Sequence, residues 1–237
     1  MKKVVISQPM FAPWLGLFEQ VKLTDIYVHL DDVQFPQGRS LTNRVQIKTP
    51  QGPKWLTVPV QHQGIELINN VLIDNTQNWK EKHLNIINSN YKKTPYFKEM
   101  LEIIELSYSF PTDKLSDLNI FMIEKIADYF GLHPIFVRSS TLGITSKSTN
   151  RLLEIVKNFN GDTYITGHGA RNYLDHELFE NNNIKVEYMN YNRSSYPQLH
   201  GDFDAHVSSL DLIANVGRKG EKFINSQTKQ WRDFINE

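Results

Sequence analysis

The chain has 237 residues, 40% hydrophobic and 22% charged, which is the balance of a globular protein with a buried core. Lys and Arg together number 26, and Asp and Glu together number 26, so the net charge of zero gives no electrostatic reason to expect nucleic acid or an anionic membrane as partner. The absence of cysteine excludes disulfides, thiolate catalysis and cysteine-bound zinc, and it fits the reducing cytoplasm, where we expect the protein.

A βαβ unit opens the chain. Residues 4–7 are a short β-branched apolar run that stops at Gln8-Pro9, which predicts a buried strand and a turn. Residues 14–23 place apolar side chains close to helical spacing, and residues 26–30 form a second apolar run. A strand, a short helix and a second strand imply parallel pairing with a right-handed crossover.

The segment 36–130 interrupts this alternation, and we expect it to be an insertion subdomain within a single α/β domain spanning 1–237. Its first part, 36–75, has stretches in which apolar and polar residues alternate, with glycine-containing turns between them. This pattern predicts an antiparallel β excursion. The alternating stretches are 44–49, 54–60 and 67–73.

The second part of the insertion, 79–130, predicts helices. One covers 79–108 and is broken at Thr94-Pro95, because a residue that precedes proline avoids the helical conformation. The other covers 116–130, with Ser116 as its cap and Gly131 at its end.

Strands and helices alternate again after residue 130. Apolar runs at 135–138, 163–166 and 185–189 predict three further strands. The predicted helices run from 148 or 149 to 159, over 175–182, over 209–216 and over 221–235.

These elements predict an α/β fold, doubly wound around a mainly parallel five-stranded sheet of Rossmann or nucleotidyltransferase type, with the antiparallel β excursion and the helical segment inserted. Numbered along the chain, the strands are expected in the order 3-2-1-4-5. Ligands of such sheets bind beyond the carboxyl ends of the strands, where the strand order reverses. The turn at 7–16 and the loop at 167–171 are therefore expected to face each other.

The turn at 7–16 is the first candidate element of a site. Pro9 and Pro13 fix its dihedral angles, and the helix after it offers free N–H groups and a positive dipole end to an anion. Gln8, at the carboxyl end of a strand, is expected to contact backbone or ligand. Trp14 is either a ligand contact or a plug of the core.

Asp31 and Asp32 directly follow the second predicted strand. An acidic residue at this place in a Rossmann-like sheet takes a ribose hydroxyl or a metal. The alternative is a turn pair that caps the strand end. Because side chains alternate along a strand, we expect only one of the two to point into the crevice.

Polar residues of the excursion form a further candidate set. Asn43 and Arg44 have Arg39, Lys48 and Lys54 nearby. Arginine suits bidentate contact with phosphate or carboxylate, so these residues would form a diphosphate site if they lay opposite a helix N-terminus. The alternative is solvated charge on a hairpin.

The loop at 167–173 contains His168 between two glycines, which would expose its imidazole. An imidazole has a pKa suited to general base catalysis near neutral pH. The alternative is a hydrogen-bonding role without catalysis. Arg171, at the start of the next helix, is a candidate anion contact.

Several familiar motifs are missing from the sequence: HExxH, Walker A, GxGxxG and GxSxG. The 8 histidines show no spacing typical of metal ligands, and we predict no metal site. The apolar runs are shorter than the roughly 20 residues that span a bilayer, so we also predict no membrane insertion.

The chain contains the stretches VVISQPMFAPWLGLFEQVKLTDIYVHLDDVQF, TNRVQIKTPQGPKWLTVPV, NYKKTPYF, TGHGARNYL, SYPQLHGDF and SSLDLIANVG. Together they resemble the WbqC-like family along nearly the whole chain. The opening pattern is Gln-Pro, then Pro-aromatic-x-Gly, then a strand that ends in Asp-Asp-Val. Many members carry His before Gln-Pro, where this chain has Ser7. The matching polar positions are Gln8, Asp31, Asp32, Asn43, Arg44, Tyr91, Tyr96, Arg171 and Tyr173.

The resemblance implies a role in O-antigen or other surface-polysaccharide biosynthesis, because the family's genes lie among enzymes for unusual nucleotide-linked sugars. Many such sugars carry an amino group that is later acylated. The first interpretation is therefore an N-acyl or aminoacyl transferase that acts on a nucleotide-linked amino sugar. The expected donor is an acyl-CoA or an acyl-carrier-protein thioester, and the latter would make a carrier protein the partner.

In this interpretation His168, Asp31 or Asp32 is the base, and Gln8 and Asn43 polarise the reacting groups. Arg44 and Arg171 contact the diphosphate. The remaining expected substrate contacts are Trp14, Tyr91, Tyr96 and Tyr173.

Two alternatives stay open. The βαβ opening with its proline-rich turn also resembles class I nucleotidylyltransferases, which would require ATP or CTP and Mg²⁺. Their HxGH-type pair has no counterpart in residues 11–16 of this chain. The other alternative is a non-enzymatic binding protein of polysaccharide assembly.

Overall fold

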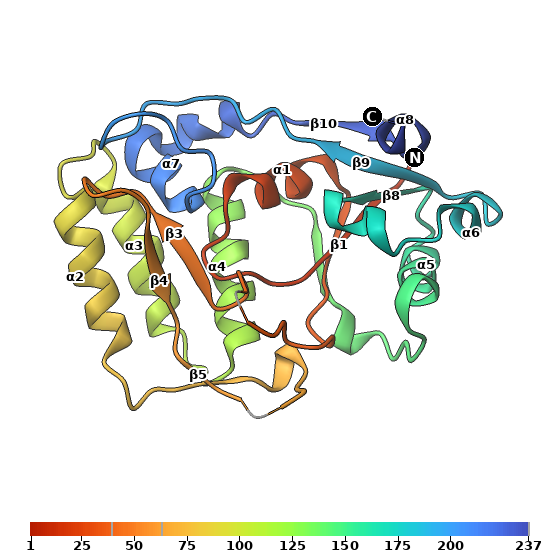
Figure 1. The fold of residues 1–237 in the computed structure, drawn as a ribbon, viewed down its shortest axis with the longest axis horizontal. Helices are drawn as coiled ribbons and strands as arrows, with labels where there is room; N and C mark the ends of the chain where they lie inside the picture. Colours follow the sequence, from red (N-terminus) through yellow and green to blue (C-terminus); the bar gives the residue numbers. More distant parts are fainter. Residues whose placement is uncertain (39, 63, 237) are drawn as a thin grey trace.

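A six-stranded sheet forms the centre of the computed structural model, which describes residues 1–236 except 39 and 63 (Figure 1). Five strands are parallel, and the sixth pairs antiparallel at one edge. The order is β10 (Gln227–Gln230), β9 (Lys185–Asn190), β8 (Thr163–Thr166), β1 (Lys3–Ser7), β2 (Ile26–His29) and β7 (Ile135–Arg138). The mainly parallel α/β fold and the order of the five predicted strands are confirmed.

The C-terminal segment differs from the prediction. In place of a helix over 221–235 there are a 3₁₀ helix η4 (Gly217–Phe223), the strand β10 and a short helix α8 (Trp231–Ile235). β10 pairs with β9, for example Thr228 opposite Met189. The open edge of β9 offers backbone partners to this polar segment, and such tertiary pairing overrides local propensity.

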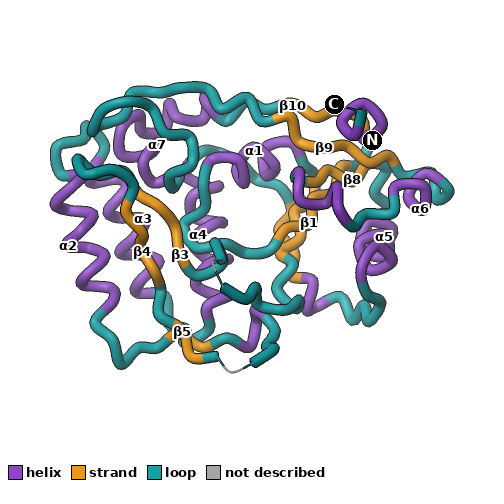
Figure 2. The backbone as a smooth tube through the Cα atoms, in the orientation of Figure 1, coloured by secondary structure: helices purple, strands orange, loops and turns teal. Residues whose placement is uncertain are grey.

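Helices cover both faces of the sheet (Figure 2). Successive residues of β1 point to opposite faces. Val5 joins one core cluster with α1 (Leu15–Leu23) and α4 (Leu115–Tyr129), whereas Val4 and Ile6 join a second cluster with α5 (Ser148–Asn158) and α6 (His176–Glu180). The central strands are apolar throughout because both of their faces are buried.

The excursion consists of two small antiparallel ladders. β3 (Arg44–Ile47) pairs with β4 (Lys54–Thr57), and β5 (Val60–Gln61) pairs with β6 (Leu72–Ile73). A 3₁₀ turn, η1 (Ile68–Asn70), precedes β6. The antiparallel character is as predicted, but the strands are shorter than the alternating stretches.

Helices α2 (Trp79–Tyr91) and α3 (Phe97–Ser109) follow, and the break between them at Thr94-Pro95 is confirmed. The predicted cap of α4 was wrong: the helix begins at Leu115, and Ser116 is buried inside its first turn. Gly131, with φ +70°, ends the helix as predicted.

Two more 3₁₀ turns and one helix complete the chain. η2 (Ser139–Thr141) follows β7, and η3 (His168–Asn172) follows β8. Asp175 caps α6 by accepting a hydrogen bond from the backbone N–H of Leu178 at 3.0 Å. α7 (Ser209–Val216) packs against α3, and the two chain termini lie close together beside β9 and β10 (Figure 1).

Polar contacts from distant segments hold the turn that follows β1. Asn119 of α4, fully buried, donates from its amide to the carbonyls of Pro9, at 3.1 Å, and Thr42, at 2.7 Å. Ser208 donates from its hydroxyl to the carbonyl of Ala12 at 2.7 Å. The turn is therefore fixed by α4 and by the start of α7 as well as by its prolines.

His83 of α2 ties this turn to the helical segment. Its Nε2–H donates to the carbonyl of Thr57 at 3.1 Å, its Nδ1 accepts from the Tyr108 hydroxyl at 2.9 Å, and its ring lies 5.9 Å from that of Phe11. The side chain is buried, and burial lowers the pKa of His83 to about 4.

This lowered pKa predicts a pH dependence of stability. Between the ordinary histidine pKa of about 6.5 and about 4, the unfolded chain binds a proton that folded His83 does not. The free energy of unfolding should therefore decrease as the pH falls through this window, by up to about 3 kcal/mol. Urea unfolding at a series of pH values measures it. His83→Gln should remove this part of the pH dependence, and an unchanged dependence in the variant would assign it to other groups.

Candidate functional site

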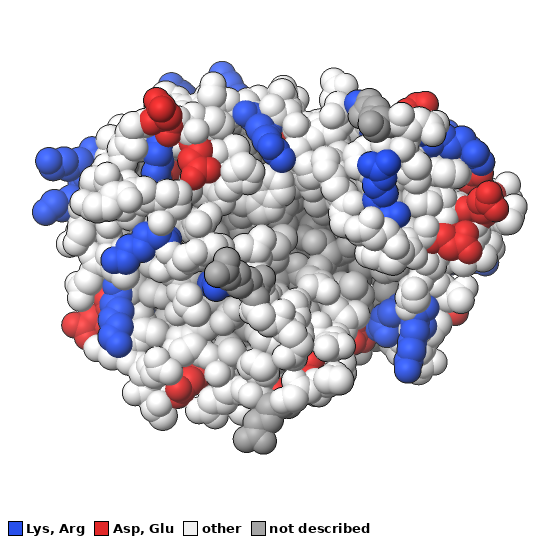
Figure 3. Space-filling model, in the orientation of Figure 1, with Lys and Arg blue, Asp and Glu red and all other residues white. Residues whose placement is uncertain are grey.

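A cavity of about 480 Å³ lies where the strand order reverses, beyond the carboxyl ends of β1 and β8. Residues 6–8 and 10 form one wall, and 167, 169, 170 and 173 form the opposite one, so the two predicted loops do line one cavity. Residues 36 and 40–42 of the excursion complete the rim. In Figure 3 this face of the molecule is hollowed near its centre, and the walls are mostly free of charged residues.

Hydroxyl and amide groups dominate the polar lining of this cavity. The described lining residues include no Asp, Glu, His, Lys or Arg. The amide of Gln8 has no hydrogen-bond partner among the described residues and is half-buried. The polar lining residues are Ser7, Gln8, Gln20, Ser40, Thr42, Tyr164, Thr166 and Tyr173.

Gln20 of α1 orients a tyrosine behind the cavity wall. Its Nε2–H donates to the hydroxyl of Tyr191 at 2.8 Å. A Cβ added at Gly167 would lie 3.3 Å from that hydroxyl, so the glycine leaves space for the side chains of Gln20 and Tyr191. Burial raises the pKa of Tyr191 to about 12, and its phenol therefore stays protonated near neutral pH. Its ring contacts Trp14 and His168, with centroids 5.0 and 5.1 Å away.

A smaller pocket adjoins this cavity and shares Met10 and Leu41 with it. It contains two residues from the predicted list. Trp14 lines it from the turn, and Arg44 lines it from the start of β3. Gln8, predicted to polarise a reacting group, and the predicted substrate contact Tyr173 thus line the cavity, and Trp14 and Arg44 line the pocket beside it.

Asp31 and Asp32 point away from the cavity, toward the turn after β7. Asp31 is 1% exposed and accepts hydrogen bonds from the Ser139 hydroxyl and from both the backbone N–H and the hydroxyl of Ser140. Asp32 accepts from Ser139 and forms an ion pair with Arg151 at 2.5 Å. Their contacts join the ends of β2 and β7, as the capping alternative predicts.

His168 is exposed and sits between two glycines that line the cavity, although its own side chain does not line it. Its Nε2–H donates to the carbonyl of Met189 at 2.7 Å, which leaves Nδ1 as the acceptor nitrogen. Arg171 donates to the carbonyl of Ile235 at 2.7 Å and lies over the ring of Phe234, outside the cavity.

Two other candidates of the excursion, Asn43 and Lys48, have structural partners. Asn43 donates to the carbonyl of Val58 at 3.1 Å. Lys48 is buried, and its ammonium donates to Oε1 of Gln198 at 3.0 Å and to the carbonyls of Gly201 and Asp202. Lys54 is exposed, and Arg39 lies outside the described residues.

Tyr91, also buried, contacts Lys48 and Asp211 of α7. Its hydroxyl donates to Asp211 at 2.9 Å and accepts from the backbone N–H of Lys48 at 3.0 Å. Burial raises the pKa of Asp211. Tyr91, the last residue of α2, is thus a core residue and lines neither the cavity nor the pocket.

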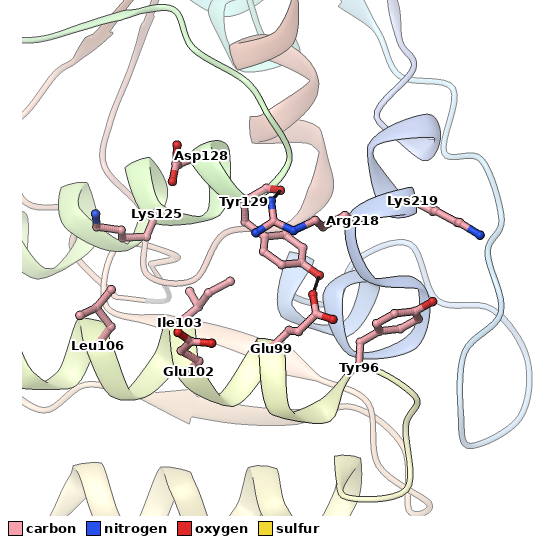
Figure 4. Close-up of a pocket in the computed structure, with 10 residues that line it drawn as sticks. All are labelled: Tyr96, Glu99, Glu102, Ile103, Leu106, Lys125, Asp128, Tyr129, Arg218 and Lys219. Atoms are coloured by element: carbon pink, nitrogen blue, oxygen red, sulfur yellow. Dashed lines mark hydrogen bonds between the residues drawn. The ribbon is translucent and has the colours of Figure 1, made fainter.

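Tyr96 lies elsewhere, in an open groove of about 550 Å³ between α3, α4 and η4 (Figure 4). There Tyr129 donates to Glu99 at 2.5 Å, and the guanidinium of Arg218 lies 4.8 Å from the Tyr129 ring. The ring of Tyr96 packs against Gly217: a Cβ added to this glycine would lie only 2.5 Å from the ring. These contacts join α3, α4 and η4, and the groove shares no lining residue with the cavity beyond β1 and β8.

The predicted anion site at the first helix is covered. Leu15, Gly16 and Leu17 are buried, and a Cβ on Gly16 would lie 2.2 Å from the ring of Trp14. None of these three residues lines the cavity, whereas Gln20, one turn later, does.

Gln20, Ser40, Thr42 and Thr166 are lining residues that the sequence reasoning missed. Thr166 ends β8, and the rule for the carboxyl ends of strands could have identified it. Trp55 lines the adjoining pocket, but nothing in the sequence singled it out as a candidate site residue.

Across the described part of the chain, no three His, Asp or Glu side chains form a group that could hold a metal ion. No helix there has the length and apolar character that crossing a membrane requires.

Comparisons with known proteins agree with the sequence resemblance. The WbqC-like protein family matches residues 8–223. An uncharacterized protein of Mycobacterium tuberculosis is 33% identical over 228 residues, which cover 94% of this chain and 98% of the relative. No solved structure matches this chain.

The contacts of Asp31 predict a structural role that stability can test. Asp31→Ala would leave the backbone N–H and the hydroxyl of Ser140 without their acceptor, and the buried Ser139 hydroxyl with Asp32 alone, at an expected cost of about 1–3 kcal/mol in the free energy of unfolding. Urea unfolding measures the change, with exposed Asp113→Ala as the control. A variant of unchanged stability that had lost its ligand would instead make Asp31 a binding residue.

Proposed function

The chain belongs to the WbqC-like protein family, and from this premise we propose that it is a transferase modifying a nucleotide-linked amino sugar in O-antigen or surface-polysaccharide biosynthesis. The transfer is of an N-acyl or aminoacyl group. The observation that carries the proposal is the uncharged lining of hydroxyl and amide groups in the cavity beyond the carboxyl ends of β1 and β8.

Sugars are recognised by such a lining because each of their hydroxyls both donates and accepts hydrogen bonds. Serine, threonine and glutamine side chains do the same, without the desolvation cost of a buried charge. The unpartnered amide of Gln8, directly after β1, and the hydroxyl of Thr166, at the end of β8, are the groups best placed for this. At about 480 Å³ the cavity is within the range of small-molecule sites, roughly 300–1,000 Å³.

The transfer step needs an acyl thioester as co-substrate, either acyl-CoA or an acylated carrier protein. The sugar amine attacks the thioester carbonyl, the C–N bond forms, the C–S bond breaks and the thiolate leaves, taking up the proton that the amine has given to the base. The amine proton passes to a base, and we assign this role to Nδ1 of His168, whose Nε2–H is held by the Met189 carbonyl. Its neighbours Gly167 and Gly169 line the cavity, so the substrate amine would approach along this loop.

The same lining favours a second candidate function, a non-enzymatic protein that binds the sugar. None of the described side chains that line the cavity carries a carboxylate or an imidazole. His168→Ala separates the two candidates. Loss of transfer with retained sugar binding supports the transferase, whereas binding without transfer in the native protein supports the second function.

Binding can be tested by thermal denaturation with nucleotide-linked amino sugars, acyl-CoA and ATP–Mg²⁺. A ligand at 100 times its Kd stabilises the native state by about 2.7 kcal/mol, so we expect a Tm increase of roughly 5–10 °C with the nucleotide-linked sugar. A response to ATP–Mg²⁺ alone would favour nucleotidyl transfer and overturn the proposal.

Gln8→Leu removes the unpartnered amide at nearly constant volume. We expect a nucleotide-linked amino sugar to bind about 3–10-fold more weakly, because one hydrogen bond contributes about 0.5–1.5 kcal/mol. Calorimetric titration measures the affinity, with exposed Gln51→Leu as the matched control. Equal affinities of the two variants would place the sugar outside this cavity.

A further inference from the structure

The pocket beside the cavity is small and mostly apolar. It holds about 160 Å³, less than a complete small-molecule site, and it opens next to the larger cavity at Met10 and Leu41. A space of this size suits one ring system of a larger ligand. Its main walls are Met10, Trp14, Leu41, Arg44, Trp55 and His206.

Two indole rings line this pocket from different segments. Trp14 is held in place by the close approach of Gly16 beneath its ring and by Tyr191 beside it, with centroids 5.0 Å apart. Trp55 is on β4, and 41% of it is exposed, although it is one of the largest apolar side chains. Exposed aromatic surface beside a pocket is typical of a place where a planar ligand stacks.

Arg44 gives the pocket a positive charge that has no acidic partner in the described part of the chain. Its guanidinium lies 4.4 Å from the centroid of the Trp55 ring, and its Nε is buried without a hydrogen-bond acceptor. Among the described residues, Arg44 has no carboxylate within ion-pair distance, whereas Arg138, Arg151 and Arg232 each have one. A half-buried guanidinium without an anion is costly, and its planar fork matches phosphate oxygens.

We propose that this pocket is a nucleoside diphosphate subsite, in which the base stacks on the indole rings of Trp14 and Trp55 and the phosphates bind Arg44. The placing of the attached sugar in the adjoining cavity rests on the proposed function. The stacking subsite rests on the aromatic walls and the unpaired guanidinium alone. Because stacking tolerates any base, aromatic contact gives affinity for nucleotides in general.

The test is calorimetric titration of the full chain with uridine, UMP and UDP, and with dTDP, GDP and CDP in parallel. We expect the diphosphates to bind more tightly than the nucleoside. Trp55→Ala should weaken UDP binding about 5- to 150-fold, the range measured for base stacking on aromatic side chains, and Trp55→Phe should restore part of it. Arg44→Gln should weaken UDP about 10- to 150-fold and leave the affinity for uridine unchanged.

The chain contains a matched control for both variants. Arg232 lies over the ring of Trp231 at 4.3 Å, the same geometry as Arg44 over Trp55, but this pair lies on α8 outside both the cavity and the pocket. Trp231→Ala and Arg232→Gln should leave UDP binding unchanged. Trp55 is partly exposed, so its variants should remain folded, and melting curves without ligand establish this.

Three results would overturn the subsite: no binding of any nucleoside diphosphate, equal affinity of the native protein and Trp55→Ala, or binding of a base-free pantetheine thioester that depends on Trp55. Failure of the proposed function gives a different result. UDP would still bind through Trp55 and Arg44, but a UDP-linked amino sugar would bind no more tightly than UDP, and Gln8→Leu would have no effect.

Discussion

One buried amide joins two segments of the cavity rim. Asn119 donates from α4 to the carbonyls of Pro9 and Thr42, so a single side chain joins the turn after β1 to the excursion. These two segments are neighbouring parts of the cavity rim; besides Asn119, a backbone hydrogen bond from the N–H of Phe11 to the carbonyl of Leu41, at 3.3 Å, joins them. Removing both hydrogen bonds would leave two buried carbonyls without donors, which is far more costly than the bonds are worth when water can replace them. The position of α4 therefore helps to fix these two rim segments relative to each other.

The sequence was sufficient to predict the strand order, because apolar runs locate the buried strands and right-handed crossovers restrict how they can be arranged. The rigidity of the first turn was predicted from Pro9 and Pro13, whereas the structure adds contacts from Asn119 and Ser208. Such contacts join residues far apart in the chain, and no local pattern announces them. The strand β10 was missed for the same reason, because its polar sequence becomes a strand only beside the open edge of β9.

The candidate site was predictable to the extent that it follows from the ends of strands. Gln8 directly follows β1 and lines the cavity. Asp31 and Asp32 lie shortly after β2, but Ser139 and Ser140, which follow β7, and Arg151 bind their carboxylates. All three are polar residues just beyond the carboxyl end of a central strand; the difference lies in which partners the fold supplies. Trp55 is the opposite case: a tryptophan in an alternating strand is expected in the core, but 41% of this side chain is exposed beside the pocket.

Lys48 has a consequence for how the pocket keeps its shape. Its ammonium sits among oxygens of Gln198, Gly201 and Asp202, in the manner of a bound metal ion that gathers the carbonyls of a loop. Here the cation is the side chain of Lys48, which directly follows β3. Its effective concentration at the loop around 198–202 is therefore set by the chain and not by the surrounding solution. A chelator cannot remove it, and no ion supply is needed. Because His206 of the same loop reaches the aromatic pocket, that wall is assembled whenever the excursion is folded.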